Sequence, residues 1–128
     1  GESLTSYYQK GAPADWQQHY ISEYATAHPW EDWAESWAHY LHIMDMTETA
    51  HFFGMSLKPK LSSKTLRGAI DEDPYEVSNF EKIFKAWMPA SFAINSLNRS
   101  MGIPDAYPFV VSPAVVDKLK AIHQLIMT

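Results

Sequence analysis

The sequence predicts an all-α fold, a compact bundle of about five or six helices in a single domain over residues 1–128. Two observations support this prediction. Apolar residues recur every three or four positions in most of the chain, which is the period of a helix with one buried face. Proline, acidic residues and glycine stand where helices start and stop. The one strand-like run, Tyr107–Val111, is too isolated to form a sheet with a buried face.

The composition favours a packed protein and argues against several functional classes. The chain has 128 residues, of which 46% are hydrophobic, and five Trp, which is enough apolar surface for one core. A net charge of -5 provides no positive field for phosphates, so we expect no nucleic-acid partner. There is no Cys, no apolar run as long as a membrane span, and no signal-peptide pattern in the first ten residues. We therefore expect a cytoplasmic protein without a membrane partner.

Three helices are expected in the first half of the chain. The first spans Pro13–Tyr24, where aromatic residues recur every four positions. The second begins at Pro29, a residue that suits the first helical position. Its apolar positions define a face that we expect to be buried: Trp30, Trp33, Ala34, Trp37, Leu41 and Met44. Asp45 opens a capping-box pattern, so we expect a short third helix from there to Gly54.

The second half is expected to contain a loop and three further helices. Residues 55–71 lack periodicity and are expected to form an exposed loop, with Lys58, Lys60, Ser62, Ser63, Lys64 and Arg67 in its basic part. Asp73 and Pro74 are typical of a helix start, and Pro89 is expected to break or kink that helix. Its core face is Phe80, Ile83, Phe84 and Trp87. Helices are also expected over Ala90–Met101 and from Ser112 onward, the last with a face of Val116, Leu119, Ile122 and Ile126.

A polar stripe on the second helix holds the residues best suited to chemistry. At 100° per residue, Glu31, Glu35, His39 and His42 fall within a sector of about 80°, beside the tryptophan-rich face. Carboxylates and imidazoles at spacings of three and four can converge on one zinc ion and its surrounding ligand shell. On pattern alone, an ordinary solvated helix edge is the favoured explanation of the stripe, because charged helix edges are common.

Two other metal motifs are incomplete in this chain. Glu48 and His51 form one ExxH, whereas di-iron carboxylate bundles need two such motifs and two further Glu. No His is followed by Glu, so the HExxH helix of zincin peptidases is absent.

Residues 24–42, with the sequence YATAHPWEDWAESWAHYLH, resemble a stretch of a zinc-binding metallopeptidase family of bacterial proteins. Two later segments are similar to the same family, Ala93–Gly102 and Tyr107–Pro113. The resemblance covers nearly the whole chain. In that family a zinc ribbon and an HExxH helix precede the matching stretch, so the chain looks like the C-terminal part of a zincin-like metallopeptidase.

The resemblance implies specific roles, because zinc proteases similar to lethal factor carry an E-x-x-A-E stretch after HExxH with a Tyr seven residues upstream. It implies Glu31 as the third zinc ligand, Glu35 as a carboxylate that orients a ligating His, and Tyr24 as a hydroxyl near the substrate carbonyl. It also implies zinc in the full-length protein and a peptide or protein substrate. The chain alone is expected to bind no zinc and to be inactive, because its partner, the N-terminal HExxH and zinc-ribbon portion, is missing.

Several alternatives stay open at the level of sequence. Tyr24 continues an aromatic period and could be a core residue, Glu35 could be the ligand in place of Glu31, and His39 and His42 could line the cleft or pack at its edge. The competing function is a non-catalytic helical protein-interaction module. We assign no catalytic role to three residues near a helix end or to one on the last helix, which are expected to cap, cross-link or pack: Asn95, Asn98, Arg99 and His123.

Overall fold

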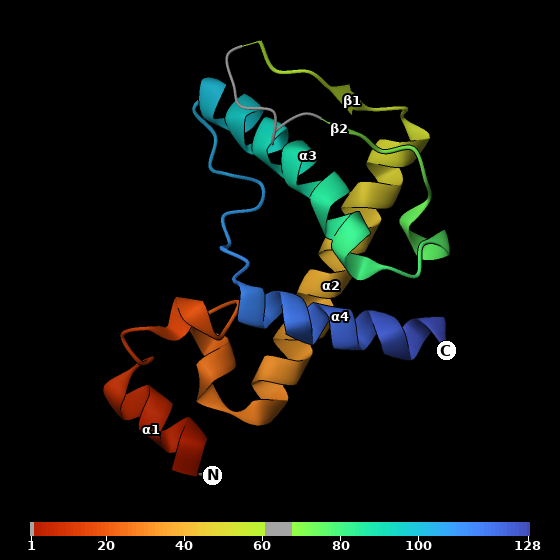
Figure 1. The fold of residues 1–128 in the computed structure, drawn as a ribbon. Coiled ribbons are helices and arrows are strands. Elements are labelled where there is room, and N and C mark those ends of the chain that lie inside the picture. Colours follow the sequence, from red (N-terminus) through yellow and green to blue (C-terminus); the bar gives the residue numbers. More distant parts are fainter. Residues whose placement is uncertain (1, 61–67) are drawn as a thin grey trace. The chain divides into compact units, whose positions relative to one another are not determined.

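The computed structural model describes residues 2–60 and 68–128, and Figure 1 shows their path. The α-helices are α1 (Glu2–Lys10), α2 (Pro29–Phe52), α3 (Phe80–Ser100) and α4 (Pro113–Met127). Short 3-10 turns are η1 (Trp16–Gln18), η2 (Tyr24–Ala27) and η4 (Pro74–Glu76). Strands β1 (Ser56–Leu57) and β2 (Gly68–Ala69) pair antiparallel, Ser56 with Ala69 and Leu57 with Gly68. The all-α prediction is confirmed, with four α-helices in the described residues where five or six were expected.

The chain divides into two compact units. One consists of residues 1–41 with 109–128, and the other of residues 42–108. Helix α2 crosses from the first into the second. The prediction of a single domain over residues 1–128 stays a prediction. In the described residues no helix has both the length and the apolar character to cross a membrane, and the cytoplasmic location likewise stays a prediction.

The predicted helix over Pro13–Tyr24 does not form. The structure has two 3-10 turns there, and the first α-helix is instead α1, which ends before Gly11 at a φ of 72°. Backbone carbonyls in this segment serve other partners. Gln18 O accepts a hydrogen bond from Ser112 Oγ (3.0 Å), and His19 O accepts one from Lys118 Nζ (2.6 Å). Hydrogen bonds to Ser112 and Lys118 therefore hold this segment, and the helical period of its own sequence does not decide its conformation.

The expected second and third helices are one continuous helix, α2. Asp45 does not cap a new helix start, because its carboxylate accepts a hydrogen bond from the hydroxyl of Tyr75 (2.6 Å). Thr47 donates its hydroxyl proton back to the carbonyl of Ile43 (2.7 Å), which is compatible with an uninterrupted helix. The predicted stop at Gly54 is confirmed, since Gly54 has a φ of 66°.

The buried face of α2 differs from the predicted one. Trp30 is 73% exposed, Trp33 46% and Leu41 42%, so these members of the predicted face point outward. Trp37 is half-buried, and Met44 is buried as predicted. The other buried side chains follow the helical period on a neighbouring side of α2: Ser36, His39, Tyr40, Ile43, Thr47 and Ala50. Some of the polar residues can be buried because they form hydrogen bonds within the protein, as Thr47 does. The polar residues of α2 therefore do not by themselves show which face is exposed.

In the unit of residues 42–108, α3 starts later and continues further than predicted. Pro74 belongs to a separate 3-10 turn, and the helix begins after Asn79. Pro89 lies inside α3 without ending it, because the apolar face continues on both sides: Phe80, Ile83, Trp87 and Ala90 are buried. Ala90 joins Ala50 and Ile70 in one core cluster. The expected loop over residues 55–71 carries the two strands, and its Ser62, Ser63, Lys64 and Arg67 lie outside the described residues.

Helix α4 begins where the sequence predicted. Ser112 Oγ accepts a hydrogen bond from the backbone N–H of Val115 (3.4 Å), and Pro113 occupies the first turn. Leu119 and Ile122 are buried as expected, while Ile126 is 41% exposed.

The cap of α3 provides a test of this fold. Asn79 Oδ1 accepts hydrogen bonds from the N–H groups of Glu81 (3.0 Å) and Lys82 (3.4 Å). Asn79→Ala should lower the free energy of unfolding by about 1 kcal/mol, whereas Asn79→Asp, which retains an acceptor, should leave it nearly unchanged. Urea titrations followed by circular dichroism measure both. Equal stability of the two variants would contradict the cap.

Candidate functional site

The polar stripe lies on the N-terminal part of α2. Local hydrogen bonds fix where this helix begins. The carbonyl of His28 accepts hydrogen bonds from the N–H groups of Glu31 (2.9 Å) and Asp32 (3.0 Å), and His28 Nδ1 accepts one from Trp30 N–H (3.1 Å). Glu31 and Asp32 stand in the first turn, where negative charge complements the positive end of the helix dipole. The helix start is thus well determined by its own residues.

Lys118 of α4 anchors this helix start. Its Nζ lies 3.0 and 2.9 Å from the two carboxylate oxygens of Asp32, and 4.3 Å from the centre of the Tyr20 ring. The pair is about a quarter to a third exposed, so solvent screens it only partly. One ammonium group therefore joins α4, the start of α2 and the segment before η2.

A buried hydrogen bond determines which side of α2 faces the core. The hydroxyl of Tyr40 lies 2.7 Å from Nδ1 of His123 on α4, and both side chains are fully buried. Burial raises the pKa of Tyr40 to about 12. His123 is a satisfied packing residue, in agreement with the role expected from the sequence.

The structure brings Tyr24 and Glu31 together. The carboxylate of Glu31 and the hydroxyl of Tyr8 both lie close enough to the hydroxyl of Tyr24 to interact with it. The negative charge of Glu31 raises the pKa of Tyr24, with smaller contributions from desolvation and from Tyr8. Tyr24 is 39% exposed, which argues against the alternative reading of it as a core residue.

Glu35 and His39 form a second pair one turn further along. His39 Nε2 lies 3.7 Å from Glu35 Oε2, and the imidazole stacks edge-on against Phe109 at 4.4 Å between ring centres. His39 is 4% exposed, while Glu35 is half-buried and His42 is exposed. His39 therefore packs in the core of its unit, whereas the Glu35 carboxylate stays accessible.

The polar set near the end of α3 cross-links the segment that follows it. Asn95 exchanges two hydrogen bonds with the backbone of Tyr107, both 2.9 Å, and Asn98 donates to the carbonyl of Pro104 (3.0 Å). Arg99 contacts both carboxylate oxygens of Asp105 at 2.6 Å, which lowers the pKa of that carboxyl. These bonds match the structural role expected for the three residues.

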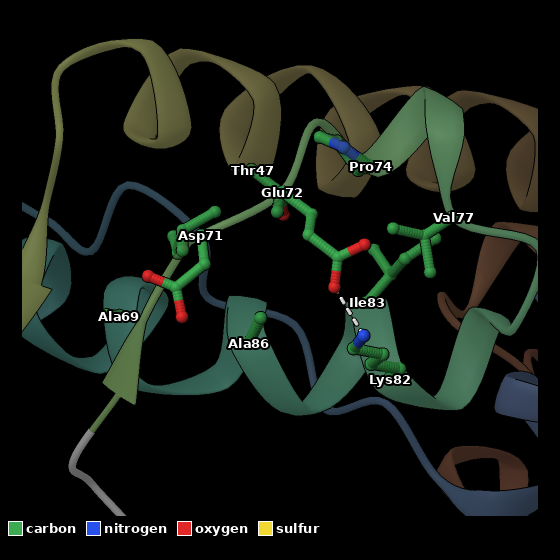
Figure 2. A pocket seen from close by; sticks show the side chains of 10 residues that line it. Thr47, Ala69, Asp71, Glu72, Pro74, Val77, Lys82, Ile83 and Ala86 are labelled. Carbon is green, nitrogen blue, oxygen red and sulfur yellow. Dashed lines mark hydrogen bonds and ion pairs between the residues drawn. The ribbon is translucent and has the colours of Figure 1, made fainter.

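Two hollows in the unit of residues 42–108 offer no comparable chemistry. One, of about 80 Å³, has a largely apolar floor, and an ion pair between Glu72 and Lys82 borders it (Figure 2). It is small beside the roughly 300–1,000 Å³ of typical ligand pockets. The other, of about 410 Å³, lies between β1 and α3, and among the described residues that line it Lys58 is the one with a charge. In this unit His51 of the ExxH pair hydrogen-bonds to the carbonyl of Ile70 (2.7 Å) and so has a structural partner.

Comparison with known proteins identifies the family to which this chain belongs. A family model described as "Putative zinc-binding metallo-peptidase" matches residues 1–125. The chain belongs to this family.

The relatives are mycobacterial. One protein of Mycobacterium bovis and two of Mycobacterium tuberculosis, all named as uncharacterized, are 39% identical to this chain over 125 residues. The match covers 98% of this chain and 34% of each relative, so the chain spans about a third of their length. No solved structure matches the chain.

The donor set of the described residues fits part of a zinc site. Nowhere in residues 2–60 and 68–128 do three or more His, Cys, Asp or Glu side chains gather in a way that could hold a metal ion. Catalytic zinc in proteins usually has three protein ligands. Glu31 and Glu35 carry carboxylates, a ligand type that zinc accepts, so these two residues amount to only part of such a ligand set.

Sequence reasoning missed Tyr8 and the packing of Tyr7. The Tyr7 ring lies 6.0 Å from that of Tyr24, and α1 thereby supports the turn that carries Tyr24. The sequence pattern that could have predicted α1 is weak. It consists of Leu4 and Tyr7, two apolar residues three positions apart, both of which are half-buried in the structure. A single helical repeat in a nine-residue helix is too short to stand out.

The burial of Tyr40 predicts an alkaline loss of stability. The folded-state pKa of Tyr40, about 12, lies above its ordinary value of 10.0, so the proton is held more tightly in the folded chain. The contribution is complete below pH 10 and is lost as pH rises through 12, by up to about 2–3 kcal/mol. Urea unfolding at a series of pH values measures it.

Tyr40→Phe is the matched control. It should be less stable at neutral pH, because His123 loses its buried partner at a cost of about 1–3 kcal/mol, and it should lack the Tyr40 part of the alkaline step. An identical alkaline decline in both proteins would rule out Tyr40 as the titrating group.

Proposed function

We propose that this chain is the C-terminal helical portion of a zinc-dependent metallopeptidase of the gluzincin type, to which it contributes Glu31 as the third zinc ligand and part of the substrate cleft. The observation that supports this most is the contact between Tyr24 and Glu31 at the accessible start of α2. A metal-binding carboxylate and a hydrogen-bond donor for substrate are thereby adjacent, as gluzincin chemistry requires.

Each residue has a distinct task in this proposal. The carboxylate of Glu31 would hold zinc together with two His from an HExxH helix, which the resemblance to the family implies upstream of this chain. Zinc, when bound, supplies Lewis-acid polarisation and activation of water. Glu35 would accept a hydrogen bond from a ligating His and fix its orientation.

Tyr24 would act on the substrate. Peptide hydrolysis adds one water across the C–N bond and yields a carboxylate and an amine, with negative charge developing on the carbonyl oxygen. A tyrosine hydroxyl is protonated at neutral pH and can donate a hydrogen bond to that oxygen. His39 is buried and would support Glu35, while His42 is accessible to form part of the cleft wall.

The competing proposal, a non-catalytic helical interaction module, is favoured by the exposed tryptophans of α2. The two proposals differ in one simple observation. A full-length reading frame with HExxH upstream of residue 1 supports the peptidase, and a frame without it supports the interaction module.

The 128-residue chain should bind zinc weakly or not at all, because one or two carboxylates do not replace three ligands. After dialysis against zinc-free buffer, metal analysis should find well under one zinc per chain, and the full-length protein should retain the zinc of the peptidase site in addition to the zinc of its ribbon. The zinc measured in the experiments below is that of the peptidase site. Stoichiometric zinc in the dialysed chain would contradict the prediction. Alanine variants of Glu35, His39 and His42 would then identify the ligands.

Substitutions in the full-length protein separate the two principal roles. Glu31→Gln should remove zinc and peptidase activity together. Tyr24→Phe should keep zinc and lower turnover by about 10²–10³, the usual cost of losing an oxyanion donor. Glu48→Gln, at a half-buried carboxylate on the same helix, is the control and should change neither quantity.

Three results would change the assignment. Full zinc occupancy in Glu31→Gln would transfer the ligand role to Glu35, one turn later. Unchanged turnover in Tyr24→Phe would reject the role of Tyr24. If Glu31→Gln and Glu35→Gln both kept metal and activity, the peptidase site would not lie on this stripe.

A further inference from the structure

The apolar side of α2 is only partly covered in the described chain, where Trp30, Trp33 and Leu41 are exposed and Trp37 is half-buried. We call Trp30, Trp33, Ala34, Trp37 and Leu41 the tryptophan face. Its exposure is greatest at Trp30, 73%, and Trp33 and Trp37 stack edge-to-face on each other at 5.8 Å between ring centres. Contiguous exposed apolar side chains of this size mark interaction surfaces in most proteins.

A cavity opens on one flank of this face. It has a volume of about 210 Å³ and is lined by Trp33, Ser36 and Ile122 among others. The hydroxyl of Ser36 is buried and has no hydrogen-bond partner in the described part of the chain. An unpaired buried hydroxyl costs about 1–3 kcal/mol, so a group that enters the cavity and bonds to it would recover energy. In protein interfaces, the side chains that contribute most to binding usually fill a cavity of this kind next to aromatic residues.

The carboxylate stripe lies on the other flank. Along α2, Glu31 follows Trp30 and Glu35 follows Ala34, so each carboxylate is rotated by about 100° from a member of the tryptophan face. A structure that covers the face would therefore reach Glu31 and Glu35 as well.

We propose that the tryptophan face of α2 is the docking surface for the part of the full-length protein that this chain does not include. The inference rests on the proposed function, which needs ligands from that part. The relatives are about three times as long as the matched region, since it covers 34% of them, so a protein of their length would have a large remainder that could occupy the surface. Docking there would bury the exposed indoles and bring further zinc ligands to Glu31.

A second copy of the chain fits the surface less well. It would bring its own Glu31 and Glu35 to the same helix edge, and each copy carries a net charge of -5. Like charges across an interface oppose association. A self-dimer also adds carboxylates only, whereas the proposed remainder adds the imidazoles that a catalytic zinc site requires.

Photo-crosslinking in the full-length protein tests the proposal directly. Benzoylphenylalanine replaces Trp30 and, as control, Leu125 of α4, which is 60% exposed. Illumination should link position 30 within one molecule to a peptide from outside the 128 residues, as identified by mass spectrometry. Position 125 should give at most weak links to that peptide. Links from position 30 only to residues of this chain, a covalent dimer, or no link at all would each overturn the proposal.

A charge substitution gives an independent measurement. Trp30→Lys should lower the melting temperature of the full-length protein by several degrees and weaken zinc binding about tenfold or more. The 128-residue chain with the same substitution should melt as the unsubstituted chain does, because Trp30 is largely exposed in it. Unchanged melting and zinc binding in the full-length variant would count against docking.

The outcomes separate this inference from the proposed function. Zinc loss in Glu31→Gln together with an uncrosslinked position 30 would leave the ligand role intact and reject the docking surface. The expected crosslink together with full zinc in Glu31→Gln would establish the surface and reject Glu31 as the ligand.

Discussion

The rotation of α2 about its own axis is the constraint on which the candidate site depends, and the Tyr40–His123 hydrogen bond holds it. Both side chains are fully buried and each is the other's polar partner. If α2 were turned so that its tryptophans faced inward, Tyr40 would be exposed and His123 would lose this hydrogen bond. The free energy gained by burying the tryptophans would have to exceed the cost of that loss. With Tyr40 inside, Glu31 and Glu35 lie on the accessible edge.

The start of α2 is held in place by interactions of a different kind. Lys118 binds the carboxylate of Asp32 and the carbonyl of His19, and its ammonium lies over the ring of Tyr20. These contacts fix the chain just before η2, and α1 supports η2 from the other side through Tyr7. As a result Tyr24 is positioned against Glu31 by two separate parts of the sequence.

The candidate site is best understood as one side of a larger arrangement. Its carboxylates are accessible, the neighbouring indoles are exposed, and a cavity beside them contains an unpaired hydroxyl. A metal site of two His and one Glu needs its ligands from at least two segments, because no single helix turn can direct all three at one ion. The proposed docking surface and the proposed ligand are therefore two aspects of one interface.

The sequence by itself determined the fold class, the family and several helix ends. The start at Ser112–Pro113 and the stop at Gly54 depend on local backbone chemistry, and the structure retains both. The motif around Glu31 identified the candidate residues without any coordinates.

The tertiary structure alone decided how those helices are used. Asp45 has the chemistry of a cap but bonds to Tyr75, far along the chain, so two expected helices became one. Trp30 and Trp33 have the period of a core face, yet Tyr40 and His39 are buried instead, because a sequence shows that a helix has distinct faces but not which face has a partner. The pairing of Tyr24 with Tyr8 likewise depends on α1, whose own pattern is too short to recognise.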